Sequence, residues 1–205
     1  MYDKRAALVE LGKHLGLFSV NHDHQQALGA SACVVTAIEK DAAVLSSPTA
    51  AAEQKLASLK YLGHWVGDVH QPLHVSFEDN RGGNNIRVSR ECSGNLHAVW
   101  DNCLVIKAMG SDASAIATSL EKAITAADVT AWTGSTPMEW ANEAFEITES
   151  AKTEYCDLQQ GVCTPSSKSV KIDQSYIAAN APLVRLQLQK AGVRLAQMLD
   201  ETIGQ

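Results

Sequence analysis

Helical periodicity is the feature that most restricts the fold of this chain. A run of about 20 residues that opens at Thr49 and ends at Pro72 carries apolar side chains near helical spacing. These side chains are Leu56, Leu59, Leu62 and Val66. Proline disfavours helical backbone in the residue before it, so the helix should stop there. The sequence therefore predicts one long helix at this position.

Further helices are predicted on both sides of it. Ser31 fits the N-cap of a helix that ends before Ser46, and others should begin near Asn95 and Asp112. Thr136-Pro137-Met138-Glu139 has the residues of a capped start, for a helix reaching Tyr155. A last helix carries Leu183, Leu186, Leu195 and Leu199, with Pro182 as a kink or as its first turn.

Two segments lack this pattern. Residues 75–94 are rich in Gly, Asn and Ser, and the short alternation Ile86-Arg87-Val88 predicts a small hairpin-like insertion. Residues 156–171 are expected to form a loop. The predicted class is all-α, and 205 residues fit a single domain over 1–205.

Composition restricts the kind of protein that this chain can be. Hydrophobic residues make up 45% and charged residues 20% of the chain, which is typical of a globular protein and excludes wholesale disorder. No apolar run approaches the ~20 residues needed to span a bilayer. Charged residues interrupt the first 18 positions, so no signal peptide is visible there.

The net charge of −6 argues against one mode of nucleic-acid binding. A wide basic surface relies on clustered Lys and Arg that displace counterions from phosphates. Affinity for phosphate would therefore have to be local, and bound divalent cations can supply it.

The five cysteines indicate an oxidising compartment. Cys92 with Cys103, and Cys156 with Cys163, lie close enough in sequence to close short disulfide loops, which leaves Cys33 over. The alternative is five free buried thiols in a cytosolic protein, because spacing alone does not prove pairing.

Histidine and aspartate recur at one spacing. His64-x-x-x-Asp68 and His97-x-x-x-Asp101 each place an imidazole and a carboxylate on one face of a helix, and both are zinc ligand types. His74 follows Pro72 and can supply a third ligand. Three protein ligands are typical of a catalytic zinc, whereas structural sites are closed by four.

A single such pair would more often be a surface ion pair or a capped core histidine. Two pairs that bracket GDVHQPLH favour a metal site over that alternative. We expect a structural or outer-sphere role for His70, which is less suited to ligation. Trp65 and Trp100 are expected in the core, although an exposed aromatic ring beside a metal can stack on a base.

Three segments in order, HWVGDVHQPLHV, RGGNN and NLHAVWD, resemble the hallmark segments of the zinc-dependent single-strand-specific nucleases, the S1/P1 family. The likeness runs from about Ala30 to the C-terminus and includes ACVVTAIEKDAAVL, TPMEWANEA and KAGVRLAQMLDE. It implies an all-α fold shared with zinc-dependent phospholipase C, built around up to three zinc ions.

The resemblance also implies roles for particular residues. His74, His97 and Asp101 match the complete protein ligand set of one zinc. His64 matches a ligand of a second zinc, and Asp68 matches the carboxylate that serves the second and third. Asp68 is also the catalytic group expected to orient the attacking water. Asn84 matches the Asn of the GGN segment, and its role stays open.

The implied reaction is hydrolysis of phosphodiester bonds in single-stranded DNA or RNA to 5′-phosphate products, with 3′-nucleotidase activity as a further expectation. Two alternatives remain: a truncated zinc-binding family member with weak or no activity, and a zinc-dependent phospholipase C. HQPLH together with NLHAVWD favours the nuclease. Family resemblance and the cysteine pairs together imply a secreted or periplasmic protein.

The N-terminal segment departs from the family pattern. Members begin with a zinc-binding Trp and add His and Asp ligands before the helix that starts here near Ser31, and residues 1–30 are divergent or truncated by comparison. The family's partner for a cysteine at position 33 also lies upstream. No ligand is assigned to His14, His22 or His24, because NHDHQQ is typical of a solvated loop.

Overall fold

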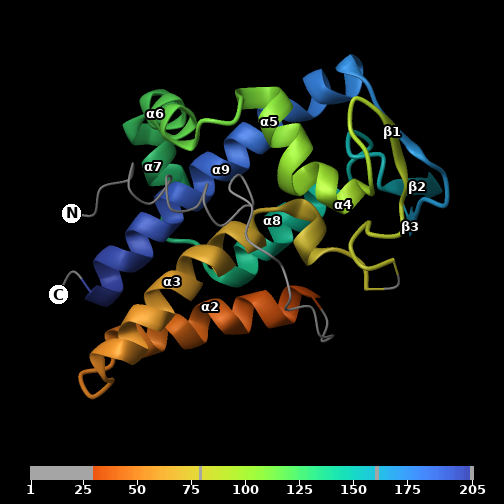
Figure 1. Cartoon of the computed structure of the whole chain (residues 1–205). Helices are drawn as coiled ribbons and strands as arrows, with labels where there is room; N and C mark the ends of the chain where they lie inside the picture. The colour runs from red at the N-terminus through yellow and green to blue at the C-terminus, as the bar shows by residue number, and fades with distance from the viewer. Residues whose placement is uncertain (1–29, 79, 160–161, 204–205) are drawn as a thin grey trace.

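The computed structural model describes residues 30–78, 80–159 and 162–203. Its first two helices, α2 (Ala30–Ser46) and α3 (Ala52–Val69), pack side by side along their length (Figure 1). They bury Ile38 and Leu45 against Leu62 and Val66, which confirms the predicted helical pair.

The start of α3 differs from the prediction. The helix begins at Ala52 rather than Thr49, and the backbone N–H of Ala51 donates to Oε1 of Gln54 at 2.9 Å. Leu56 lies at the edge of the face formed by Leu59, Leu62 and Val66, and 54% of its surface is exposed. The apolar face of α3 therefore consists of fewer residues than its leucine spacing indicated.

The longest described helix, α9 (Gln174–Ile203), packs against α2, α3, α5, α6 and α7 (Figure 1). Oδ1 of Asp173 accepts the N–H groups of Ser175 and Tyr176, which fixes its first turn. The helix continues through Pro182, so that proline is not its start.

A second group of helices follows the glycine-rich segment. The short helix α4 (Leu96–Ala98), the π-helical turn η3 (Val99–Cys103) and α5 (Leu104–Met109) follow one another directly. Asp112 caps α6 (Ala113–Ala123), and α7 (Ala126–Trp132) is an additional helix that the sequence pattern did not predict.

The capping signal at Thr136 is confirmed. Thr136 and Glu139 form a capping box at the start of α8 (Pro137–Glu149), which ends earlier than the predicted Tyr155. A turn that begins at Ser150 separates Tyr155 from the helix. The ring of Tyr155 is fully buried in the core.

The strands are few and lie together at one end of the molecule (Figure 1). β1 (Val88–Arg90) pairs in parallel with β4 (Val170–Ile172), while β2 (Cys156–Gln159) and β3 (Val162–Pro165) pair antiparallel. The hairpin-like insertion predicted around residues 86–88 is reduced to one antiparallel bridge between Arg87 and Asn95. The segment 156–171, predicted to be a loop, contains strands because β4 completes a ladder with distant β1.

The two predicted disulfides are present. Cys92 bonds to Cys103, and Cys156 bonds to Cys163 across the β2–β3 pair. The side chain of Cys33 lies outside the described part of the structure. The described helices include none that is long and apolar enough to cross a membrane. The fold is all-α with small sheets, as predicted.

Candidate metal centre

Three separate segments carry the five predicted site residues to one place. His64 and Asp68 lie on the last turns of α3, His74 lies on the 3-10 helix η2 (Pro72–Val75), and His97 and Asp101 lie on α4 and η3. The turn at Pro72 reverses the chain after α3 and packs η2 against α8. The structure therefore brings together all five residues.

One group of three has the spacing of a metal site. One donor atom each from His74, His97 and Asp101 lies within 4.8 Å of the others. The two imidazole rings stack with centroids 4.7 Å apart. Nε2 of His74 is 3.1 Å from Oδ1 of Asp101, and Nε2 of His97 is 3.6 Å from its Oδ2. Among the described residues, these three form the group that has metal-ligand spacing.

Asp68 joins this group to His64. Oδ2 of Asp68 is 3.3 Å from Nε2 of His64 and 3.5 Å from Nδ1 of His74. Its carboxylate therefore stands between the two imidazoles, and only 14% of its side chain is exposed. A second cation in this position would meet one imidazole and one carboxylate from the described residues.

The backbone selects the tautomer of His97. Its Nδ1 is 2.8 Å from the carbonyl oxygen of Gly82, which can only accept, so Nδ1 carries the proton. The lone pair on Nε2 then points toward the carboxylate of Asp101. This is the usual arrangement around a metal-binding histidine, whose other nitrogen donates to a fixed acceptor.

Electrostatics make the cluster attractive to positive charge. Burial lowers the pKa of His74, but attraction to Asp68 and hydrogen bonds to Asp101 and Asp68 outweigh it and raise that pKa to about 10. Burial raises the pKa of Asp101, yet the hydrogen bond and charge of His74 bring it down to about 2. Burial and the neighbouring charge of His74 lower the pKa of His97. The two ionised carboxylates thus hold a proton on His74 and would attract a metal ion.

Two residues that contact the cluster were not predicted from the sequence. Gln71 donates from Nε2 to Oδ1 of Asp101, and Gly82 supplies the carbonyl that fixes His97. The sequence signals were present as the Gln of HQPLH and the Gly pair of RGGNN, but their contacts depend on tertiary structure. Asn84, whose role was open, braces the same loop by donating to the carbonyl of Arg81 and accepting from Asn95.

The other candidates have core positions. His70 is buried, with Nδ1 against the carbonyl of Val66 and Nε2 accepting from Arg194, so it belongs to a structural network as expected. Trp100 is buried and donates to the hydroxyl of Tyr176. Trp65 is partly buried and donates to Asp41. His14, His22 and His24 lie outside the described residues.

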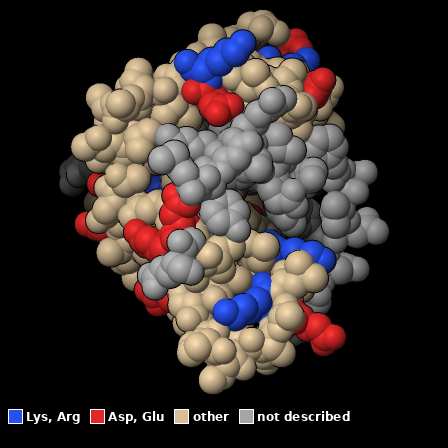
Figure 2. All heavy atoms as spheres, turned by 90° about the vertical axis from the view of Figure 1, so that its left-hand side faces the viewer, with Lys and Arg blue, Asp and Glu red and all other residues tan. Residues whose placement is uncertain are grey.

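The residues present fit a zinc ion by their chemistry. Two imidazole nitrogens and one carboxylate oxygen are donors that zinc accepts, and three protein ligands leave a fourth position open. On the face in Figure 2, the described Lys and Arg side chains form small groups interspersed with acidic ones.

The fold and cluster together define a helical protein with a His-His-Asp cluster that could hold a metal ion. The comparisons with known proteins give the family: a sequence model described as S1/P1 Nuclease matches residues 15–204, and the chain belongs to this family.

Individual relatives agree with this assignment. Endonuclease 2 of Arabidopsis thaliana is 31% identical over 176 residues, covering 78% of this chain and 58% of the relative. Nuclease P1 of Penicillium citrinum is 28% identical, covering 90% of this chain and 72% of the relative. Nuclease S1 of Aspergillus oryzae is 28% identical, covering 87% and 65%. The chain spans about half the length of several plant relatives that it matches.

Proposed function

We propose that this protein is a zinc-dependent endonuclease that hydrolyses phosphodiester bonds of single-stranded DNA or RNA to 5′-phosphate products, with 3′-nucleotidase activity. The observation that carries the proposal is the convergence of His74, His97 and Asp101 within 4.8 Å in a chain of the S1/P1 nuclease family. The relatives named endonuclease or nuclease support the reaction class.

In this proposal His74, His97 and Asp101 hold one zinc, and His64 with Asp68 contribute to a second. Bound zinc supplies Lewis-acid charge that favours ionisation of an attacking water and neutralises the phosphate. Attraction to the neighbouring imidazoles lowers the pKa of Asp68 despite its burial, so its carboxylate is ionised near neutral pH. Its Oδ atoms can therefore accept a hydrogen bond from the attacking water and orient it.

The negative net charge supports local rather than extended binding of the substrate. Without a broad basic surface, affinity for a polyanion depends on positive charge inside the site. Single strands and short nucleotides can place a phosphate in such a site more readily than a rigid duplex. The two disulfides fit an oxidising compartment, and we place the protein outside the cytoplasm, secreted or periplasmic.

A test compares wild type with His97→Ala for bound zinc, thermal stability, and turnover of single-stranded DNA and of a phosphatidylcholine analogue. We expect wild type to cleave the DNA and not the lipid. His97→Ala should lose one zinc and melt at lower temperature, because a metal bound only by the native state adds its binding free energy to folding.

His22→Ala serves as the control and should change neither zinc content nor melting temperature. Equal zinc content in His97→Ala and wild type would contradict the assigned ligand set. Zinc binding without cleavage of either substrate would instead identify the chain as an inactive family member.

A further inference from the structure

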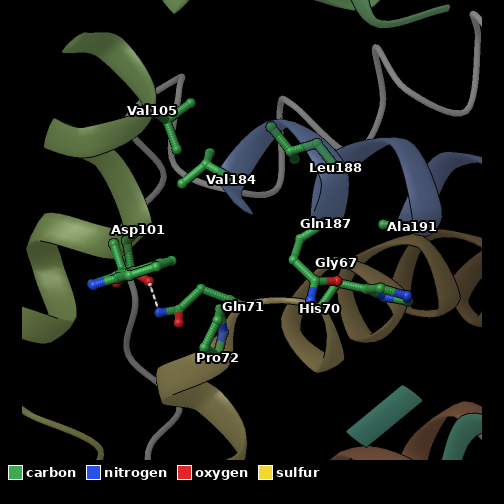
Figure 3. A pocket seen from close by; sticks show the side chains of 11 residues that line it. Gly67, His70, Gln71, Pro72, Asp101, Val105, Val184, Gln187, Leu188 and Ala191 are labelled. Atoms are coloured by element: carbon green, nitrogen blue, oxygen red, sulfur yellow. Dashed lines mark hydrogen bonds between the residues drawn. The ribbon is translucent and has the colours of Figure 1, made fainter. Parts of the chain in front are cut away.

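Gln71 occupies a buried position between two of the segments that form the metal centre. It directly precedes η2, and its side chain reaches across to η3, where Figure 3 shows it pointing at Asp101. Only 6% of the residue is exposed. A buried carboxamide needs partners for both its oxygen and its nitrogen.

The orientation of this carboxamide follows from its partners. The backbone N–H of Leu73 lies 2.5 Å from Oε1 of Gln71, and a backbone N–H can only donate. Nε2 is therefore the atom that faces Asp101, and it donates to Oδ1 at 2.7 Å. Both ends of the amide are used, and exchanging them would break both hydrogen bonds.

Each of these hydrogen bonds acts on a different candidate ligand. The bond to Leu73 caps η2, the turn that carries His74. The bond to Asp101 fixes the carboxylate so that Oδ1 faces His74 and Oδ2 faces His97. One side chain thus sets the position of two donors that are far apart in the sequence.

We propose that Gln71 is a positioning residue that holds Asp101 and the His74 turn in the geometry required to bind zinc. The inference rests on the proposed metal site. Groups that orient metal ligands through hydrogen bonds typically change metal affinity by about 10–100-fold when removed. Neither glutamate nor methionine can replace the carboxamide: an ionised glutamate cannot donate to Asp101, and methionine forms neither hydrogen bond.

A second glutamine, Gln187 of α9, provides a matched control. It lines the same cavity as Gln71, is 5% exposed, and points toward Gly67 in Figure 3. Its Oε1 has no hydrogen-bond partner among the described residues. Gln187→Met therefore removes a buried carboxamide of the same type without touching a candidate zinc ligand.

The experiment measures zinc affinity of the full chain by competition with a chromogenic chelator, for wild type, Gln71→Met, Gln71→Glu and Gln187→Met. We expect both Gln71 variants to bind zinc about 10-fold or more weakly than wild type. Gln187→Met should retain wild-type affinity within about 2-fold, since the described hydrogen bonds of the candidate ligands do not include Gln187. Visible absorption of the Co²⁺-loaded proteins reports ligand geometry, and only the Gln71 variants should show a changed spectrum.

A merely structural role predicts another result. Melting of the metal-free Gln71 variants would then fall while zinc affinity and the Co²⁺ spectrum stayed at wild-type values, and that result would overturn the proposal. Failure of wild type to bind zinc would remove the metal site itself, and the proposed function with it. The two failures are therefore distinguishable.

Discussion

Gly82 shows how a residue without a side chain can orient a candidate metal ligand. Its φ of +61° lies in the left-handed region, and its carbonyl accepts from Nδ1 of His97. A Cβ at this position would overlap the carbonyl oxygen of Leu73 and crowd Nδ1 of His97 at 3.3 Å. Glycine is therefore required both by conformation and by space.

Gly82→Ala should lower both stability and zinc affinity. The left-handed backbone costs an alanine about 1–2 kcal/mol, and overpacking adds about 1–3 kcal/mol. Gly94→Ala is the matched control, because Gly94 has a φ of +95° with no atom within 4 Å of the added Cβ. Urea unfolding should show a larger loss for Gly82→Ala, and equal losses would contradict the role assigned to its contacts.

The candidate ligands could be predicted from sequence because helical spacing is local. Residues i and i+4 share a face, and this holds for His64 with Asp68 and for His97 with Asp101, even across the π-helical turn. The contacts of Gln71 and Gly82 could not be predicted this way. Each joins segments that meet only after the chain folds, and no local pattern encodes that meeting.

At the scale of elements, a partly buried charge network connects α9, α8 and the end of α3 beside the candidate metal centre. Arg194 of α9 is 1% exposed and donates to His70, which caps the C-terminal end of α3, and to Glu143 of α8. Its guanidinium also lies 5.3 Å from the centroid of the Trp140 ring. Burial and the charge of Arg194 lower the pKa of His70 to about 3, so its imidazole is neutral and can accept.

Arg194→Met should destabilise the protein by about 1–3 kcal/mol, because His70 and Glu143 lose a buried donor. Lys190→Met is the control: Lys190 also pairs with Glu143, at 2.9 Å, and its removal leaves the arginine contacts in place. Its cost should stay below about 1 kcal/mol. Thermal or urea unfolding compares the two variants, and equal effects would argue against an anchoring role for Arg194.

The disulfides also act on elements, by closing short loops. The chain-entropy account gives about 2–3 kcal/mol for each bridge, since the bonded cysteines are 7 and 11 positions apart. Replacing Cys156 and Cys163 with serine should lower the free energy of unfolding by that amount.

Mass spectrometry without reductant should find Cys33 unpaired and the other four cysteines in the two bridges. A bridge that involves Cys33 would show that the predicted pairing scheme is wrong.

Helices were predictable because their signals lie within a few residues, as in the capping box of Thr136 with Glu139. The pairing of β1 with β4 could not be predicted in this way, since Val88 pairs with Val170, which is far from it in the sequence. Short strands with little alternation leave no local signature. Pro182 shows the reverse problem, because packing of α9 overrides its local preference to end a helix.

At the scale of the whole molecule, the candidate ligands of the described residues suffice for one complete metal site. His74, His97 and Asp101 form one three-ligand set, whereas His64 and Asp68 supply two ligands beside it. We expect one tightly bound zinc per chain and weaker binding of any further zinc, because a catalytic zinc normally takes three protein ligands. Cleavage of single-stranded DNA should be correspondingly slow.

Zinc titration followed by calorimetry, together with turnover measured at each occupancy, checks this expectation. Three tight sites with rapid turnover would contradict it. Such a result would direct attention to His14, His22 and His24 as further ligands.

The parallel pairing of β1 with β4 has a consequence for synthesis of the chain. Strand β1 lies between the loop that carries Gly82 and the helix that carries His97, and its partner β4 is made much later, just ahead of α9. Contacts between distant residues form slowly, while short-range bonds form early. The Cys92–Cys103 bridge can therefore close on the emerging chain, whereas the β1–β4 ladder has to wait until β4 has been synthesised.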